Sequence, residues 1–209
     1  MKTTIYSHRG YWHYNKFQNT LNSFKLSWKK NYSIETDLRD HNSKIVLAHD
    51  FPSKNSINLD VFLENYKIYG KNSFIAFNIK SDGMDNILRN KIREYKIKNY
   101  FLFDMSNCEA IRFIKKKMRI ATRLSEYEKI NNYLYKYSKF IWIDCFKRMW
   151  FNKNIIRKLI SDNKTPIFVS PELHRRAHSK FWKTLKEYHI KDLHICTDFP
   201  DDAYSFFHD

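Results

Sequence analysis

The 209-residue sequence is 43% hydrophobic and 17% aromatic, with three glycines and four prolines, which excludes a disordered or low-complexity chain. Its length suits one domain with a sizeable core. The formal net charge of +16 favours anionic partners such as phosphate esters, acidic polymers, membrane surfaces or nucleic acid. Alternatively, most of the lysines cover a solvated exterior and bind no particular partner.

Three widely spaced cysteines, Cys108, Cys145 and Cys196, match neither a zinc-binding spacing nor a disulfide framework. A reducing cytoplasm fits such free thiols best. The N-terminal residues have no apolar signal core, and no apolar run is long enough to cross a membrane. We therefore expect a cytoplasmic protein without a transmembrane segment.

Eight apolar, β-rich runs alternate with amphipathic stretches along the chain. The expected strands are residues 4–7, 33–39, 74–80, 100–105, 119–124, 140–146, 166–170 and 193–197. The segments between them carry apolar residues at helical spacing, as Leu21, Phe24 and Trp28 do after the first strand. This alternation predicts a parallel sheet with helical crossovers, and eight units are the number in a closed (β/α)8 barrel, the TIM barrel. We therefore expect an α/β fold with a single TIM-barrel domain over residues 1–209.

Residues 33–50 contain two acids, Glu35 and Asp37, that alternate along an expected strand. Side chains on a strand alternate between its faces, so both carboxylates point the same way and repel each other unless a cation lies between them. Mg²⁺ and Ca²⁺ prefer such oxygen ligands. A turn at residues 41–43 and a further β-rich run at 45–48 predict a short hairpin after the second strand, which would carry His49 back beside the two acids. Alternatively, this segment is a solvated edge strand with ordinary surface charges.

Almost every expected strand ends in a polar or charged residue. In TIM barrels the active site lies at these C-terminal strand ends, and charged groups that gather there usually mark chemistry. The residues at these positions are His8, Arg9, Glu35, Asp37, Asn78, Lys80, Asp104, Arg123, Asp144, Glu172 and Asp198. Asp104 and Asp198 could instead cap the helices that follow them.

Five short motifs occur in order along the chain: His8-Arg9-Gly10, Asn19-Thr20 with Phe24, residues 34–37, His49-Asp50, and residues 197–200. In this order and spacing they resemble the signature of the glycerophosphodiester phosphodiesterase family, relatives of phosphoinositide-specific phospholipase C. The resemblance spans nearly the whole chain, and the N-terminal motifs carry most of its weight. The family's fold is a TIM barrel, in agreement with the strand count.

The resemblance implies metal-dependent hydrolysis of phosphodiesters such as glycerophosphocholine, which releases an alcohol and sn-glycerol 3-phosphate. His8 and His49 would be the general acid and base, and imidazole suits both roles near neutral pH. Mg²⁺ or Ca²⁺ on Glu35 and Asp37 would polarise the phosphoryl oxygen. Arg9 would bind the non-bridging oxygens, together with Lys80. Each histidine could otherwise be an ordinary hydrogen-bonded residue.

The sequence departs from the family pattern at two positions and in one loop. The family's third metal ligand is usually a Glu two residues before a Lys, and here Asn78 stands two residues before Lys80. An amide oxygen can bind Mg²⁺ or Ca²⁺ but adds no charge, so we expect weaker metal binding. The Glu that usually precedes Asn19-Thr20 is Gln18. The insertion that many members carry after the His49-Asp50 motif is absent, which predicts a more open mouth that suits a bulky substrate.

Residues near the ends of the fifth and seventh strands could compensate for these departures. Glu172 could supply the missing carboxylate to the metal, or it could pair with Arg123 or Arg175. Arg123 is also a candidate for binding phosphate, and His174 is a candidate for binding a second anionic group.

The leading hypothesis is a phosphoric diester hydrolase of lipid metabolism. Its substrate would be a small glycerophosphodiester, or a phosphodiester of a cell-envelope glycan or its precursor. The alternative, motivated by Asn78, is a catalytically weak or silent barrel that binds phosphorylated ligands. Nucleic-acid binding rests on the net charge alone, because no nucleic-acid motif accompanies it, and we expect no specific nucleic-acid partner.

Overall fold

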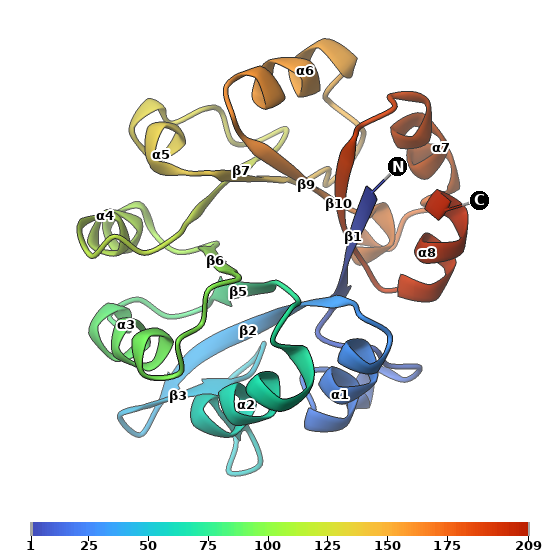
Figure 1. Cartoon of the computed structure of the whole chain (residues 1–209). Coiled ribbons are helices and arrows are strands. Elements are labelled where there is room, and N and C mark those ends of the chain that lie inside the picture. Colours follow the sequence, from blue (N-terminus) through green and yellow to red (C-terminus); the bar gives the residue numbers. More distant parts are fainter. Residues whose placement is uncertain (1, 209) are drawn as a thin grey trace. The chain divides into compact units, whose positions relative to one another are not determined.

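The computed structural model describes residues 2–208, which form two compact units. The first unit comprises residues 7–120, and the second joins the described part of residues 1–6 to that of residues 121–209. Figure 1 labels most of the strands and all eight α-helices of the two units. The single domain expected over residues 1–209 stays a prediction.

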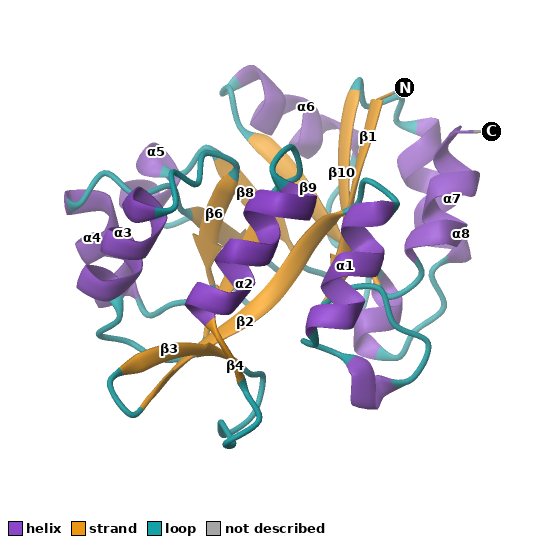
Figure 2. Ribbon diagram, turned by 60° about the horizontal axis from the view of Figure 1, so that its bottom comes forward, coloured by secondary structure: helices purple, strands orange, loops and turns teal. Residues whose placement is uncertain are grey.

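Three parallel strands form the centre of the first unit: β2 (Ser33–His41), β5 (Ile75–Ile79) and β6 (Tyr100–Phe103). The strands β3 (Lys44–Leu47) and β4 (Ile57–Asn58) continue the sheet in antiparallel pairing. Figure 2 shows β3 and β4 at the end of β2, where the sequence predicts the hairpin. The helices are α1 (Leu21–Lys29), α2 (Leu59–Asn65), α3 (Asp85–Glu94) and α4 (Asn107–Lys115), with short 3-10 and π segments at Asn15–Phe17 and Tyr66–Gly70.

The second unit has four parallel strands in the order β7 (Ala121–Leu124), β8 (Phe140–Ile143), β9 (Thr165–Val169) and β10 (Asp192–Thr197). The strand β1 (Lys2–His8) continues this order beside β10, and its last two residues belong to the first unit. The helices are α5 (Asn132–Tyr137), α6 (Lys153–Ser161), α7 (Ser179–Glu187) and α8 (Pro200–His208), with a 3-10 turn at Pro171–His174.

The alternation of strands and helices confirms the predicted α/β class. Each of the eight expected strands overlaps an observed one: β1, β2, β5, β6, β7, β8, β9 and β10. None of the helices between residues 2 and 208 is long and apolar enough to cross a membrane.

Aromatic side chains hold the helices of the first unit against its sheet. Phe24 on α1 packs edge-on against Phe62 on α2, with ring centroids 4.9 Å apart, and Phe62 packs against Phe77 on β5 at 6.1 Å. All three rings are fully buried. Burial of each contributes about 1.5–3 kcal/mol to the free energy of unfolding, so this cluster holds β2 and β5, the strands that carry the candidate site, in place.

The segment Ser33–Leu38 of β2 is buried on both faces of the sheet. The alternative interpretation of this segment as a solvated edge strand is therefore wrong. Its acids lie inside the protein, because β5 pairs with β2 in parallel and the aromatic helices cover the sheet.

A tight turn follows β1 and depends on Gly10. Arg9 and Gly10 both have positive φ, of 56° and 87°. The backbone N–H of Arg9 donates to the carbonyl of Glu35 at 2.9 Å, which ties the turn to β2. A Cβ atom on Gly10 would overlap the hydroxyl of Ser23 on α1. Glycine is therefore required here by both conformation and space.

We expect Gly10→Ala to lower the free energy of unfolding by at least about 2 kcal/mol, because it adds steric overlap to the cost of a left-handed alanine. The matched control is Gly83→Ala. Gly83 has the same φ of 87° with no atom within 4 Å of the added Cβ. It should lose only about 1 kcal/mol. Urea unfolding of both variants measures the difference, and equal losses would contradict the proposed contact with Ser23.

Candidate active site

Two buried carboxylates lie on one face of β2. Glu35 is 2% exposed, and Asp37, two residues further along the same strand, is 0% exposed. The parallel register with β5 places Asn78 directly beside Asp37. Residues paired on neighbouring parallel strands point to the same face of the sheet, as do residues two apart on one strand. Glu35, Asp37 and Asn78 therefore lie on the same face. Carboxylates this deeply buried need compensating charge.

Two basic side chains compensate the charge of Asp37. The Arg9 Nε lies 3.1 Å from Asp37 Oδ2, and the Lys80 Nζ lies 3.5 Å from Asp37 Oδ1. Lys80 also lies 3.8 Å from Asp104 Oδ2. Ion pairs to the Asp37 carboxylate on β2 therefore join the residue that follows β1 to the residue that follows β5.

Asn19 orients the Asp37 carboxylate through its own amide. Its Nδ2 donates to Asp37 Oδ2 at 3.0 Å, while its Oδ1 accepts from the hydroxyl of Thr36 at 2.7 Å. These two hydrogen bonds fix the orientation of the Asn19 amide, with its nitrogen towards Asp37 and its oxygen towards Thr36. The next residue, Thr20, caps α1 by accepting from the Ser23 backbone N–H. The Asn19-Thr20 motif thus serves both the site and the start of the helix.

Glu35 lies between His8 and the turn after β1. Its Oε2 is 3.9 Å from His8 Nε2 and accepts from the Arg9 backbone N–H at 3.3 Å. Burial raises the pKa of Glu35 to about 7, and the neighbouring negative charge of Asp37 adds to this shift. The positive charges of His8, Arg9 and Lys80 act in the opposite direction.

The hairpin after β2 brings His49 back towards the acids, as the sequence predicts. The backbone N–H of Ala48 donates to the carbonyl of Asp37 at 3.1 Å. His49 is the next residue after Ala48, so its backbone follows directly on this contact with β2. The His49 Nδ1 lies 2.8 Å from Asp50 Oδ1. If Nδ1 donates to that carboxylate, the neutral ring presents an unprotonated Nε2.

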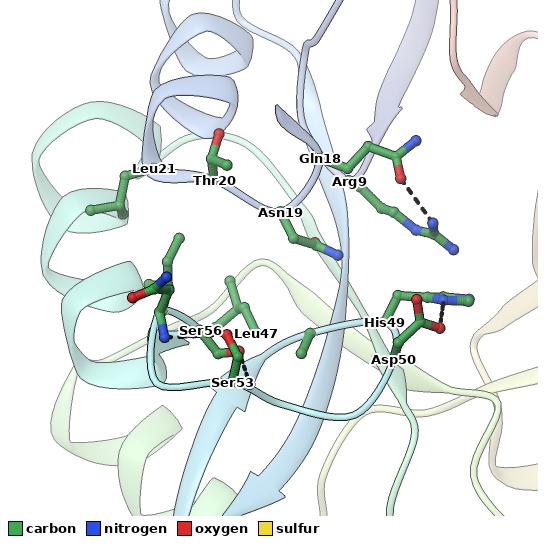
Figure 3. Close-up of a pocket in the computed structure, with 13 residues that line it drawn as sticks. Arg9, Gln18, Asn19, Thr20, Leu21, Leu47, His49, Asp50, Ser53 and Ser56 are labelled. Carbon is green, nitrogen blue, oxygen red and sulfur yellow. Dashed lines mark hydrogen bonds and ion pairs between the residues drawn. The ribbon is translucent and has the colours of Figure 1, made fainter. Parts of the chain in front are cut away.

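A pocket of about 500 Å³ opens beside this group. Arg9, Asn19 and His49 line it, and Figure 3 shows Arg9 and His49 at the same end of the pocket. The hydrogen bond from Arg9 Nη1 to Gln18 Oε1, 3.0 Å long, fixes the direction of the guanidinium group. The volume lies within the range of small-molecule sites.

The residues on this face of the sheet fit a hard divalent cation. No group of three or more His, Cys, Asp or Glu side chains within residues 2–208 could hold a metal ion. An amide is not among those ligand types, however, and Asn78 Oδ1 and Asp37 Oδ1 are both buried oxygens that accept no hydrogen bond. Two carboxylates and an amide oxygen are the donors that Mg²⁺ and Ca²⁺ prefer.

The structure gives Glu172 a different environment from those considered in the sequence. Its carboxylate accepts from the hydroxyls of Ser170 and Thr197 and, at 3.2 Å, from the backbone N–H of Asp198. His178 Nδ1 lies 3.7 Å away. These partners stand in place of the pairing with Arg123 or Arg175 that the sequence suggested, and a metal-binding role of Glu172 stays a prediction.

The two further anion-binding candidates in the second unit also have acidic partners. Arg123 forms a forked pair with Glu128, at 2.6 Å from Nε and 3.0 Å from Nη2. The His174 Nε2 lies 2.5 Å from Asp144 Oδ1, and its ring packs on Phe146. Each of these two side chains is therefore held by a neighbouring acid in the fold.

Asp104 does not cap the helix that follows it. The capping residue of α4 is Ser106, whose hydroxyl accepts from the Glu109 backbone N–H. Asp104 has a φ of 69° and directs its carboxylate to Lys80. It therefore belongs to the ion-pair group around Asp37.

Sequence reasoning missed the parts of Gln18 and Asn19 in this site. Both precede α1, and a cap-like segment before a helix usually signals the helix alone. In the sequence Gln18 stands out only as a departure from the family pattern, whereas in the fold its amide oxygen accepts a hydrogen bond from Arg9. The one signal of a second role for Asn19 is that the adjacent Thr20 is sufficient to cap the helix.

Neither a protein-family model nor a curated protein sequence matches this chain. Solved structures do match over its full length. A protein of Galdieria sulphuraria, to which glycerophosphodiester phosphodiesterase activity is ascribed, has a TM-score of 0.80 at 18% identity and covers 99% of this chain and 98% of its own. The glycerophosphodiester phosphodiesterase of Agrobacterium tumefaciens has a TM-score of 0.71 at 15% identity, with both chains covered in full.

A phosphodiesterase of Oleispira antarctica in complex with its product sn-glycerol-3-phosphate has a TM-score of 0.70 at 11% identity, covering 99% and 97% of the two chains. At these identities the likeness establishes the fold. The chain thus has the predicted α/β TIM-barrel fold, and its full-length structural resemblance to glycerophosphodiester phosphodiesterases is confirmed.

The pKa of Glu35 makes stability depend on pH. Its carboxyl ionises near 4.5 in the unfolded chain and near 7 in the fold. Between these values the folded state binds more protons, so the contribution of Glu35 to the free energy of unfolding falls as pH rises from 4.5 to 7. Urea unfolding in the presence of a chelator should show this fall. In the Glu35→Gln variant the free energy of unfolding should change less with pH between 4.5 and 7. Parallel pH profiles of the two proteins would contradict the shifted pKa.

Proposed function

We propose that this protein is a phosphodiesterase that hydrolyses a phosphodiester by general acid and base catalysis, assisted by a divalent cation. One observation carries the proposal: the buried pair Glu35 and Asp37 lies in ion-pair contact with His8, Arg9 and Lys80, in the unit whose pocket is lined by Arg9 and His49. The fold is shared with a phosphodiesterase that holds sn-glycerol-3-phosphate.

Arg9 and Lys80 supply the positive charge that a phosphodiester requires. Both are anchored on Asp37, at 3.1 Å and 3.5 Å, so they are held in place before substrate binds. Arg9 presents a planar guanidinium whose N–H groups can bind two non-bridging oxygens, whereas Lys80 acts as a point charge. Preorganised cations of this kind stabilise the charge that develops on the phosphoryl oxygens.

The two histidines divide the proton transfers. With its Nδ1 held by Asp50, His49 presents Nε2 as the base that accepts the proton of the attacking hydroxyl. Its side chain is 42% exposed, so it can return that proton to solvent. His8 lies 3.9 Å from the Glu35 carboxyl group, and we assign it the role of the acid that donates a proton to the leaving oxygen.

Glu35, Asp37 and Asn78 would hold the cation. When bound, Mg²⁺ or Ca²⁺ would polarise the phosphoryl oxygen and lower the pKa of the attacking hydroxyl. The residues themselves prepare the position: β2 and β5 hold the three oxygen-bearing side chains on one face, and Asn19 fixes the Asp37 carboxylate. With an amide in place of a third carboxylate, the set carries less charge, and binding is correspondingly weak.

We expect His8→Ala and His49→Ala each to lower kcat by about 10²- to 10⁴-fold, because each removes one proton-transfer group. The assay is hydrolysis of a panel of glycerophosphodiesters with Mg²⁺, Ca²⁺ or chelator. His208→Ala is the control, since His208 is exposed on α8 and bonds to the Tyr204 carbonyl. Full activity of His8→Ala would disprove its role. No turnover of any substrate with any metal would favour a silent phosphate-binding barrel.

We expect Asn78→Glu to tighten Mg²⁺ or Ca²⁺ binding by at least about tenfold, because it adds a carboxylate beside Asp37. Isothermal titration calorimetry of the cation alone gives the affinity without any need for turnover. Asn72→Glu, on an exposed residue of the same unit, controls for the added charge. Cation affinity equal in both variants would contradict a site on this face of the sheet.

A further inference from the structure

The pocket beside Arg9 and His49 has walls of a distinct chemical kind. Beyond these two residues, its polar side chains are mostly uncharged hydrogen-bonding groups: Gln18, Asn19, Thr20, Ser53, Asn55 and Ser56. Figure 3 shows Ser53 and Ser56 on the loop between β3 and β4, at the opposite end of the pocket from Arg9 and His49. A ligand whose phosphate lies at Arg9 would therefore extend towards this loop.

The local hydrogen bonds make the loop a source of donors. The Ser53 hydroxyl accepts from the Asn55 backbone N–H at 3.2 Å, and the Ser56 hydroxyl accepts from the Ser53 backbone N–H at 3.0 Å. An oxygen that accepts in this way still has its own hydrogen to donate. Gln18 is similar, because its Oε1 binds Arg9 and its NH₂ group remains a donor. Such donors match the oxygen atoms of alcohols.

The same walls are poorly suited to a quaternary ammonium group. Such cations are bound by aromatic faces or carboxylates. No Phe, Tyr or Trp is among the described residues that line the pocket, and its single carboxylate, on Asp50, is bonded to His49. Arg9 adds a positive charge to the lining. A cationic alcohol such as choline would lose its hydration here without a partner.

The size of the pocket agrees with an occupant larger than glycerol. Its volume of about 500 Å³ lies within the range of sites that hold small molecules. Glycerol alone would leave most of that space to solvent. A sugar or cyclic polyol would reach from the phosphate position to Ser53 and Ser56.

We propose that this pocket binds a neutral, hydroxyl-rich alcohol, a sugar or cyclic polyol, as the group esterified to the substrate phosphate. Ser53, Asn55 and Ser56 determine this specificity by hydrogen bonding to its hydroxyls. The inference rests on the proposed phosphodiesterase activity, and it narrows the substrate to phosphodiesters of polyols.

Binding is measured first, because it does not depend on turnover. Calorimetric titrations compare inositol 1-phosphate with phosphocholine, which carry the same phosphate on different alcohols. Wild-type protein should bind inositol 1-phosphate at least about tenfold more tightly, as expected for several alcohol hydrogen bonds. Asn55→Leu and Ser56→Ala should each reduce this ratio by about threefold or more. The matched control is Asn72→Leu, an exposed asparagine outside the pocket, and it should leave the ratio unchanged.

Equal or tighter binding of phosphocholine would overturn the proposal, as would binding of neither ligand or an unchanged ratio in both loop variants. Thermal melts of the variants establish that they are folded. The values of kcat/KM for glycerophosphoinositol and glycerophosphocholine then separate the two claims. A binding preference without hydrolysis of either diester would refute the phosphodiesterase activity and leave the polyol pocket standing.

Discussion

The buried carboxylate of Asp37 is the constraint on which the candidate site depends. Burying an ion costs several kcal/mol unless partners surround it. Arg9, Lys80 and Asn19 supply these partners from three separate segments: the turn after β1, the end of β5 and the residues before α1. The fold must bring these segments together to bury Asp37, so the same contacts that stabilise the first unit also assemble the residues of the proposed phosphodiester site.

Local strain accompanies this assembly. Arg9, Asn19 and Asp104 all have positive φ, at 56°, 53° and 69°, although none is a glycine. Each such conformation costs on the order of 1 kcal/mol and persists only where the surroundings require it. All three residues belong to the ion-pair and hydrogen-bond group around Asp37. The contacts that these residues make around Asp37 offset the cost of their backbone conformations. These conformations direct the three side chains towards the same ion-pair group.

In the second unit a partly buried carboxylate has a structural role instead. Glu172 gathers the hydroxyls of Ser170 and Thr197 and the backbone N–H of Asp198, and so ties the turn after β9 to the end of β10. The Trp182 indole N–H adds a bond to Ser170 at 2.7 Å. These bonds to Glu172 give Thr197 and Asp198 a structural role that does not depend on catalysis. A carboxylate at a strand end can thus serve chemistry or architecture, and its residue type alone does not decide between them.

The sequence by itself determined the order of strands and helices, the hairpin after β2 and the pairing of Glu35 with Asp37 on one face. These follow from periods of two and 3.6 residues, which act over short distances along the chain. Only the tertiary structure decided that Arg9 and Lys80 meet at Asp37, that Gln18 and Asn19 belong to the site, and that Glu172 and Arg123 have partners of their own. Such pairings join residues far apart in the sequence, and no local pattern encodes which of many charged groups will share a low-dielectric interior.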